Sequence, residues 1–363
     1  MRRGILVFAS LLVLSACGSD EDPVQPKPKV FVNPAPDGAA WPTLEEWKLF
    51  SDATSQEPSQ RVEPYDVISP LWSDGTFKRR FIHLPDEKTI DYASEGPWGF
   101  PVGTVLVKTF SYLHDAREPS LGERLLETRL LVHEASGWVG HTYVWNEEQT
   151  DAERKVAGAD IAVSFIDAAG ESQSLSYSVP NTNLCNECHG KDEPNTLGGV
   201  TRQLDREYLY AGKSKNQIDH LASLGWFTSE PEPGDQRQRM VDPEGVASVE
   251  ERARAYMDAN CAHCHDTDRV AAPSGLFLSW AETKPGADPK TFGVCKVPTS
   301  AGGGTCGLVH DVVPGDPASS ILICRVKSRE PQVQMPPLAT KRVHPAGVTL
   351  LEQWVSGLSG ACQ

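Results

Sequence analysis

Two short cysteine–histidine motifs carry the residue types best suited to chemistry. The segments Cys185-Asn186-Glu187-Cys188-His189 and Cys261-Ala262-His263-Cys264-His265 both match the pattern C-x-x-C-H. In this pattern two thiols three positions apart can bond to the two vinyl groups of a porphyrin, and the next imidazole then lies under the iron. The spacing predicts two covalently attached c-type haems, attached through Cys185, Cys188, Cys261 and Cys264 and ligated by His189 and His265.

Zinc binding and thiol redox chemistry are the alternatives for the same cysteines. A zinc ribbon pairs C-x-x-C units about 15 to 20 residues apart, whereas 72 residues separate Cys188 from Cys261. A thioredoxin-like motif requires a βαβ unit, and the sequence shows no such pattern. The histidine that follows each pair also favours haem attachment.

Met335 is the predicted second axial ligand of the C-terminal haem. It lies 70 residues after His265 and is followed by Pro336 and Pro337, which stiffen its loop. A thioether ligand raises the reduction potential of a haem iron, so this haem should be the high-potential one.

The second ligand of the N-terminal haem stays open at this level. Met1 would be removed with the signal peptide and Met257 lies on the helix that enters the second motif. The remaining candidates are Met240, His220, His141, His133 and His263, or an iron with no sixth protein ligand.

Four cysteines remain after the haem and lipid cysteines are assigned, which predicts two disulfides in an oxidising compartment. Three pairings are possible. Proximity in the sequence favours Cys295 with Cys306, around a glycine-rich loop, and Cys324 with Cys362.

The N-terminus predicts export and a lipid anchor. Residues 1–16 have the charged, apolar and small-residue regions of a signal peptide, and Leu14-Ser15-Ala16-Cys17 resembles a bacterial lipobox. Acyl chains on Cys17 would hold the protein at a membrane without a spanning segment. Residues 17–40, rich in proline and charge, are predicted to be an extended tether. The expected location is the periplasm or the periplasmic face of the outer membrane.

The charge balance excludes some partners. The formal net charge is −15, so the chain lacks the excess of Lys and Arg that nucleic acids require. An acidic surface instead suits docking to basic redox proteins of the periplasm or membrane.

A β-rich domain is predicted over residues 41–184. Thr43 and Glu46 indicate a capping box before a short helix. Short β-branched and aromatic runs, separated by turn signals, then predict antiparallel strands at 77–84, 103–112, 125–133, 140–145, 161–166 and 174–179. The pattern leaves a sandwich and an open barrel equally possible.

Helical signals replace the strand pattern from residue 185 onward. Residues 185–245 are the expected first haem segment and linker, and residues 246–363 the expected C-terminal cytochrome c-like domain. Ser248 and Glu251 predict a capping box for a helix that ends before Cys261. Asp316 and Pro345 predict the starts of two more helices. The expected class is α+β and multidomain: an antiparallel β domain followed by a mainly α domain.

Further segments flank the motifs: 100–104, 126–132, 143–152, 179–181, 273–276, 314–317 with Ser320, and 335–336. Together with both motifs they resemble an exported bacterial family of dihaem c-type cytochromes with a β-rich N-terminal region. The resemblance covers nearly all of the chain from about Trp41. The last third also resembles the class I cytochrome c fold, which implies His265 as the proximal ligand and Met335 as the distal one.

These features predict a lipid-anchored carrier that passes single electrons between redox partners. The main alternative is a dihaem peroxidase-like enzyme with an open N-terminal haem and Glu147, Glu148 or Asp151 as acid–base groups. A third reading makes the β domain a sugar- or partner-binding module through Trp72, Trp98, Trp138 and Trp145.

Overall fold

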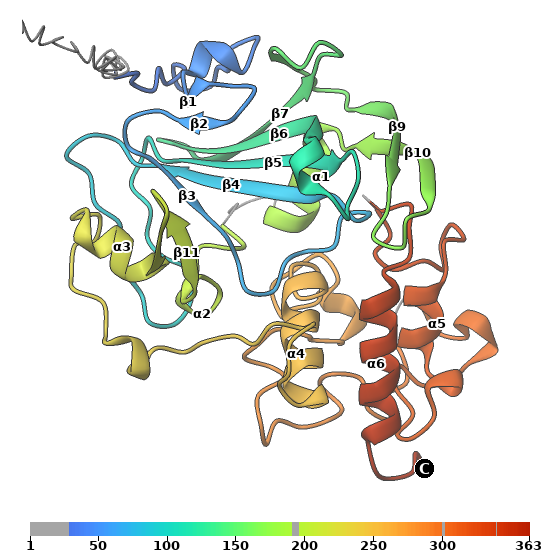
Figure 1. Ribbon diagram of the computed structural model, residues 1–363. Helices are drawn as coiled ribbons and strands as arrows, with labels where there is room; N and C mark the ends of the chain where they lie inside the picture. Colours follow the sequence, from blue (N-terminus) through green and yellow to red (C-terminus); the bar gives the residue numbers. More distant parts are fainter. Residues whose placement is uncertain (1–28, 191–195, 300–301, 339) are drawn as a thin grey trace, which may run out of the picture.

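The computed structural model describes residues 29–190, 196–299, 302–338 and 340–363 (Figure 1). The predicted signal peptide and Cys17 therefore lie outside the described residues. Among the helices of the described residues, none is long and apolar enough to cross a membrane.

An open antiparallel sheet forms the centre of the β-rich region. Its six strands follow one another in chain order, with β3 and β8 at the two edges. They are β3 (Val62–Tyr65), β4 (Phe77–His83), β5 (Val105–Leu113), β6 (Glu123–Glu134), β7 (Gly137–Trp145) and β8 (Ala152–Arg154). The meander results from short turns such as the one before Gly137, whose φ of 118° favours glycine.

Two smaller hairpins extend this region. They are β1 (Phe50–Asp52) with β2 (Glu57–Pro58), and β9 (Ala159–Ile166) with β10 (Ser172–Val179). The six strands predicted from the sequence correspond to β4, β5, β6, β7, β9 and β10, and all six are confirmed. Apolar residues within each strand and turn glycines beside it make these strands predictable. Thr43 and Glu46 form only half a capping box: the Thr43 amide donates to Glu46 Oε2 at 3.3 Å, before the 3₁₀ turn Glu45–Trp47.

The two faces of the sheet differ in character. One face packs a buried core in which Val107, Leu130 and Tyr143 meet Trp47. Residues 30–40 also lie on the β-rich region: Val30 O accepts from the Gln60 amide, and Val32, Ala35 and Ala40 pack on this core. Apolar contacts thus hold this part of the predicted tether against the fold. The other face supports helix α1 (Thr182–His189).

The predicted absence of strands after residue 185 is wrong. Strands β11 (Glu207–Tyr210) and β12 (Lys213–Asn216) form a hairpin between α2 (Thr201–Leu204) and α3 (Gln217–Ser223). Its two-residue turn has positive φ at Ala211 and Gly212, the geometry that tight hairpins favour.

The C-terminal part contains three α-helices: α4 (Val249–Asn260), α5 (Ile321–Lys327) and α6 (Pro345–Gly357). Figure 1 shows them grouped beside the sheet. Both halves of the capping box between Ser248 and Glu251 are present, and Pro345 is the first residue of α6, as predicted. Ala253, Met257, Leu322 and Trp354 form part of their common core.

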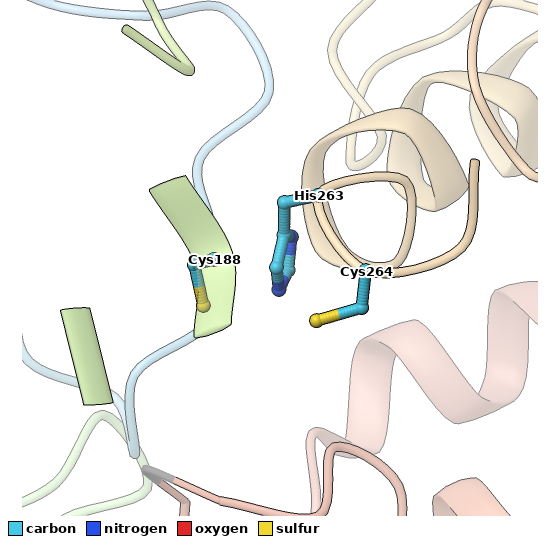
Figure 2. Close-up of side chains that lie close together, drawn as sticks. All are labelled: Cys188, His263 and Cys264. Carbon is cyan, nitrogen blue, oxygen red and sulfur yellow. The ribbon is translucent and has the colours of Figure 1, made fainter. Parts of the chain in front are cut away.

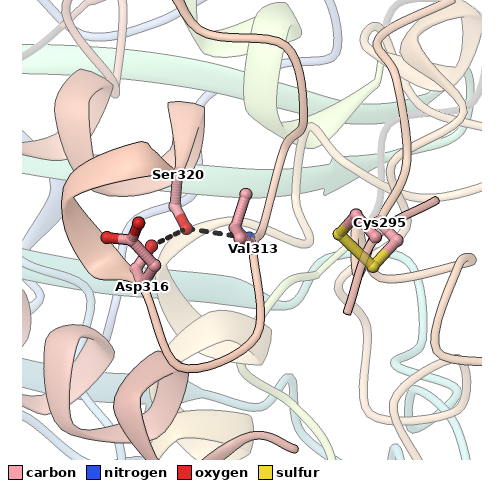
Figure 3. Close-up of a disulfide and its surroundings, with 5 residues drawn as sticks. Cys295, Val313, Asp316 and Ser320 are labelled. Carbon is pink, nitrogen blue, oxygen red and sulfur yellow. Dashed lines mark hydrogen bonds between the residues drawn. A yellow bond between two sulfur atoms is a disulfide. The ribbon is translucent and has the colours of Figure 1, made fainter. Parts of the chain in front are cut away.

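Asp316 caps a 3₁₀ turn (Pro317–Ser319) rather than α5 itself. Ser320 completes this corner: its Oγ donates to Asp316 O and accepts from the Val313 amide, each at 2.9 Å (Figure 3). The remaining 3₁₀ turns are Pro119–Leu121, Gly234–Gln236, Ala272–Ser274 and Thr305–Gly307.

The disulfides join Cys295 to Cys362 and Cys306 to Cys324, so the predicted pairing is wrong. The prediction from proximity in the sequence fails because the glycine-rich loop packs on α5 instead of closing on itself. The end of the chain also returns to the loop at Cys295, where the two Cα atoms lie 5.0 Å apart. The architecture combines a β-rich region of antiparallel sheets with helices, an α+β arrangement.

Candidate functional site

The two motifs, far apart in the sequence, meet in space. Cys188 at the end of α1 lies beside His263 and Cys264 in the turn after α4 (Figure 2). Their ligand atoms all lie within 4.8 Å of one another. The Cys264 thiol also donates to Glu187 O at 3.6 Å. The fold therefore gathers both motifs into one candidate site.

Helix α1 is fixed against the sheet by its cap and by a glycine. The Asn181 side chain accepts from the Leu184 amide at 3.2 Å and starts the helix. On β7, a Cβ at Gly140 would lie 3.4 Å from both Cβ and Sγ of Cys185. The missing side chain lets the first motif lie directly on the sheet.

Helix α4 delivers the second motif, and its last residue ties it to the β-rich region. Asn260 Oδ1 accepts from the Trp72 amide at 2.7 Å, and its Nδ2 donates to Tyr256 O at 3.1 Å. The chain then turns at Cys261, whose carbonyl accepts from the His265 amide at 2.8 Å.

Each motif lines a cavity. The first cavity, about 410 Å³, is lined by Cys185, Cys188 and His189 together with residues of the sheet and His263. The second, about 290 Å³, is lined by Cys261, Cys264, His265 and Met335. Both volumes are close to those of ligand sites. His263 and Leu338 border both cavities, which places the two side by side.

The second cavity offers the donor set of a His/Met haem. His265 and Met335 both line it, and their surroundings are largely apolar: Leu276, Leu278, Ile321, Leu322, Val326 and Val348. Burial lowers the pKa of His265 to about 4, so its ring is neutral at pH 7, the form that ligates a metal. Burial also raises the pKa of Cys261 to about 12. These residues fit a covalently attached porphyrin.

The loop that carries Met335 is held from two sides. The Met335 amide donates to Arg325 O at 3.0 Å on α5. Farther along, Asp74 accepts from the Lys341 amide at 2.9 Å and from the Arg342 amide at the same distance. The β-rich region thereby fixes one wall of the second cavity.

The four motif cysteines are free thiols, whereas the other four described cysteines form disulfides. The Cys264 hydrogen bond, with His263 and His189 nearby, lowers the pKa of Cys188 well below its ordinary value. The same hydrogen bond raises the pKa of Cys264. Cys188 thus has the thiolate character that reacting or metal-binding cysteines need.

Three of the residues predicted as possible sixth ligands of an N-terminal haem lie elsewhere. His220 Nε2 lies 3.0 Å from Glu63 Oε2, and its ring stacks on Tyr210. His133 Nδ1 lies 2.8 Å from Phe100 O. Met240 is buried, and none of these three residues lines the first cavity.

His141 borders the first cavity, but its position on the strand turns its ring away. Gly140 faces Cys185, and adjacent residues of a strand face opposite sides. The His141 ring accordingly lies 6.3 Å from the Trp47 ring, in the core behind the sheet. His263 is the candidate that the fold brings to the first cavity.

Among the residues named for the other two readings, Trp72 alone lines a motif cavity, the second one. Glu147, Glu148 and Asp151 occupy the connection between β7 and β8 and line neither motif cavity. Trp98 and Trp145 are buried in the cores, and Trp138 stacks on His133 with ring centroids 4.5 Å apart. Trp72 stacks on His344 with ring centroids 4.1 Å apart.

A comparison with protein-family models finds no match, and neither do comparisons with curated proteins and with solved structures. The geometry of the two motifs therefore carries the functional argument.

Proposed function

We propose that this chain is a dihaem c-type cytochrome that transfers single electrons between redox partners. Cys185 and Cys188 would attach one haem and Cys261 and Cys264 the other, with His189 and His265 as proximal ligands. When bound, these groups would supply one-electron redox chemistry. The proposal includes export, a lipid anchor at Cys17, and redox partners in the periplasm or membrane.

The observation that carries the proposal is the meeting of the motifs. Each motif lines its own cavity, and the cavities adjoin at His263 and Leu338. Two separately held redox groups must lie close together if electrons are to pass between them. The contact between Cys188 and Cys264 supports such a short path.

Met335 supports the same proposal for the C-terminal group. It shares the second cavity with His265, as a His/Met pair requires. The net charge of −15 supports docking of basic partners rather than nucleic acid.

Covalent haem content tests the proposal. The chain would be produced in cells with c-type haem maturation, and the pyridine haemochrome spectrum would give haems per chain. We expect two in the wild type and one in each of the variants Cys185→Ala/Cys188→Ala and Cys261→Ala/Cys264→Ala. The control Cys306→Ala/Cys324→Ala removes a disulfide and should keep two.

Absence of covalent haem would overturn the proposal. Zinc bound in its place would assign Cys188, His263 and Cys264 to a metal site instead, since these three residues already lie at ligand distances. Metal analysis of the same samples distinguishes this result from an empty protein.

A peroxidase-like activity of the first cavity is the second candidate function. Among the described residues that line this cavity there is no methionine, which favours it. Carbon monoxide binding separates the two functions. If His263 is the sixth ligand of an electron carrier, the wild type should not bind carbon monoxide, and the variant His263→Ala should bind it. An enzyme with an open iron position should bind carbon monoxide in the wild type and reduce hydrogen peroxide.

A further inference from the structure

The floor of the first cavity carries a row of three cationic side chains. Arg80 on β4 pairs directly with Lys108 on β5, and Lys108 pairs directly with Arg129 on β6. Directly opposed residues of antiparallel strands share one face of the sheet. All three residues line the cavity that also contains Cys185, Cys188 and His189.

The acidic residues near this row are each engaged by an arginine, so they do not neutralise the whole row. Glu127 accepts two hydrogen bonds from Arg129, at 2.6 and 2.8 Å, and a third from the Tyr177 hydroxyl. Asp66 is shared between Arg80 and Arg206. On the other wall of the cavity, Asp258 is engaged by Arg202 at 3.2 Å.

Lys108 is the member of the row whose charge is unmatched. Among the described residues it forms no ion pair, and its ammonium lies 5.0 Å from the Phe110 ring centroid. Burial, together with Arg80, Lys78 and Arg129, lowers its pKa well below the ordinary value. Like charges directly opposite one another destabilise a sheet, so an anion in this cavity would stabilise it.

The row begins beside the first motif and runs away from it. Cys185 lies against Gly140 on β7. From β7, Arg129 is one strand away, Lys108 two and Arg80 three. At about 4.8 Å per strand, Lys108 and Arg80 lie roughly 10 and 14 Å across the sheet from β7. The row is opposite Thr142, two residues along β7 from Gly140. A porphyrin attached through its vinyl groups carries its two propionate carboxylates at the opposite edge.

We propose that Lys108 and Arg80 bind the propionate carboxylates of the porphyrin attached to Cys185 and Cys188. This inference depends on the proposed function. The row would orient the group across the sheet, and its positive charge would favour the ferrous state. It would therefore raise the reduction potential of this haem.

The test compares Lys108→Met and Lys108→Arg in the full dihaem protein, with Lys213→Met as the matched control. Lys213 is also a strand lysine, on β12, but it is exposed and lies outside the cavity. A spectroscopic redox titration gives both potentials, and the haem whose potential responds to Met335→Ala is the second one.

We expect Lys108→Met to lower the reduction potential of the first haem only. Lys108→Arg should keep that potential near its wild-type value, and Lys213→Met should change the potential of neither haem. If the wild type holds two haems and Lys108→Met titrates like Lys213→Met, the propionate site is wrong while the cytochrome proposal stands. If the wild type holds no haem, both fail. Should Lys108→Met not fold by circular dichroism, Arg80→Gln must show the same selective decrease, and an unchanged potential there also overturns the inference.

Discussion

Cys188, His263 and Cys264 are the residues on which the proposed electron path depends. Cys188 belongs to one motif, whereas His263 and Cys264 belong to the other, and their ligand atoms lie within 4.8 Å of one another. This contact would give electrons a short path between the two proposed haems. His263 differs from the other two because it borders both cavities. In the sequence it lies between the two cysteines of its own motif.

Met335→Ala is expected to lower the reduction potential of one haem only. Met335 lines the second cavity and not the first, and loss of a thioether ligand destabilises ferrous iron. A spectroscopic redox titration measures both potentials in one sample, so the first haem serves as an internal control. Unchanged curves for both haems would remove Met335 from the site.

At the scale of elements, two helix ends position the chemistry and two disulfides hold the loops around it. The end of α1 and the turn after α4 present the motifs to one another. Cys306 fastens the glycine-rich loop to Cys324 on α5, whose Arg325 carbonyl accepts from the Met335 amide. The Cys295–Cys362 disulfide fastens the tail that follows α6.

Removing either disulfide should reduce the free energy of unfolding. The sequence separations are 18 and 67 residues. Loop-closure entropy therefore predicts losses of about 3 kcal/mol for Cys306→Ser/Cys324→Ser and about 4 kcal/mol for Cys295→Ser/Cys362→Ser. Urea unfolding of the oxidised proteins measures both, with the reduced wild type as control. Equal stability of all oxidised proteins would show that these bridges do not constrain the unfolded chain.

At the scale of the whole molecule, the β-rich and helical regions build the second cavity together. Trp72 stacks on His344, and Asp74 accepts from the backbone of residues 341 and 342. Asn260 closes the contact from the helical side through the Trp72 amide. Separating the two regions would therefore open the site of the proposed high-potential haem.

Acid should destabilise the molecule through its buried histidines. Burial lowers the pKa of His83 and of His141 to about 4, from an ordinary 6.5. The unfolded chain then binds more protons between these values, so their contribution is fully present above pH 6.5 and is lost as the pH falls towards 4. Each group should cost about 2 kcal/mol at pH 5.

Urea unfolding at pH 7.5 and pH 5 measures this effect. His141→Phe keeps a ring beside Trp47 but removes the titration, so it should lose less stability at pH 5 than the wild type. The exposed His114→Phe is the control and should behave as the wild type does. An equal loss of stability at pH 5 in all three proteins would contradict the role given to His141.

The sequence by itself determined the local features. Periodicity and turn glycines predict β4–β7, β9 and β10, and Ser248 with Glu251 predicts the start of α4. These signals act within a few residues. The C-x-x-C-H spacing is equally local, so both motifs were visible without a fold. The sequence does not predict the hairpin at 207–216, because Ala211 is an unusual turn residue.

Only the tertiary structure decided what lies next to what. The disulfide partners, the meeting of Cys188 with Cys264, and the cationic row on the sheet all join residues from separate elements. Neither spacing nor composition encodes such contacts, because they depend on how the strands register and how the helices pack. The choice of His263 over His220 at the first cavity follows for the same reason.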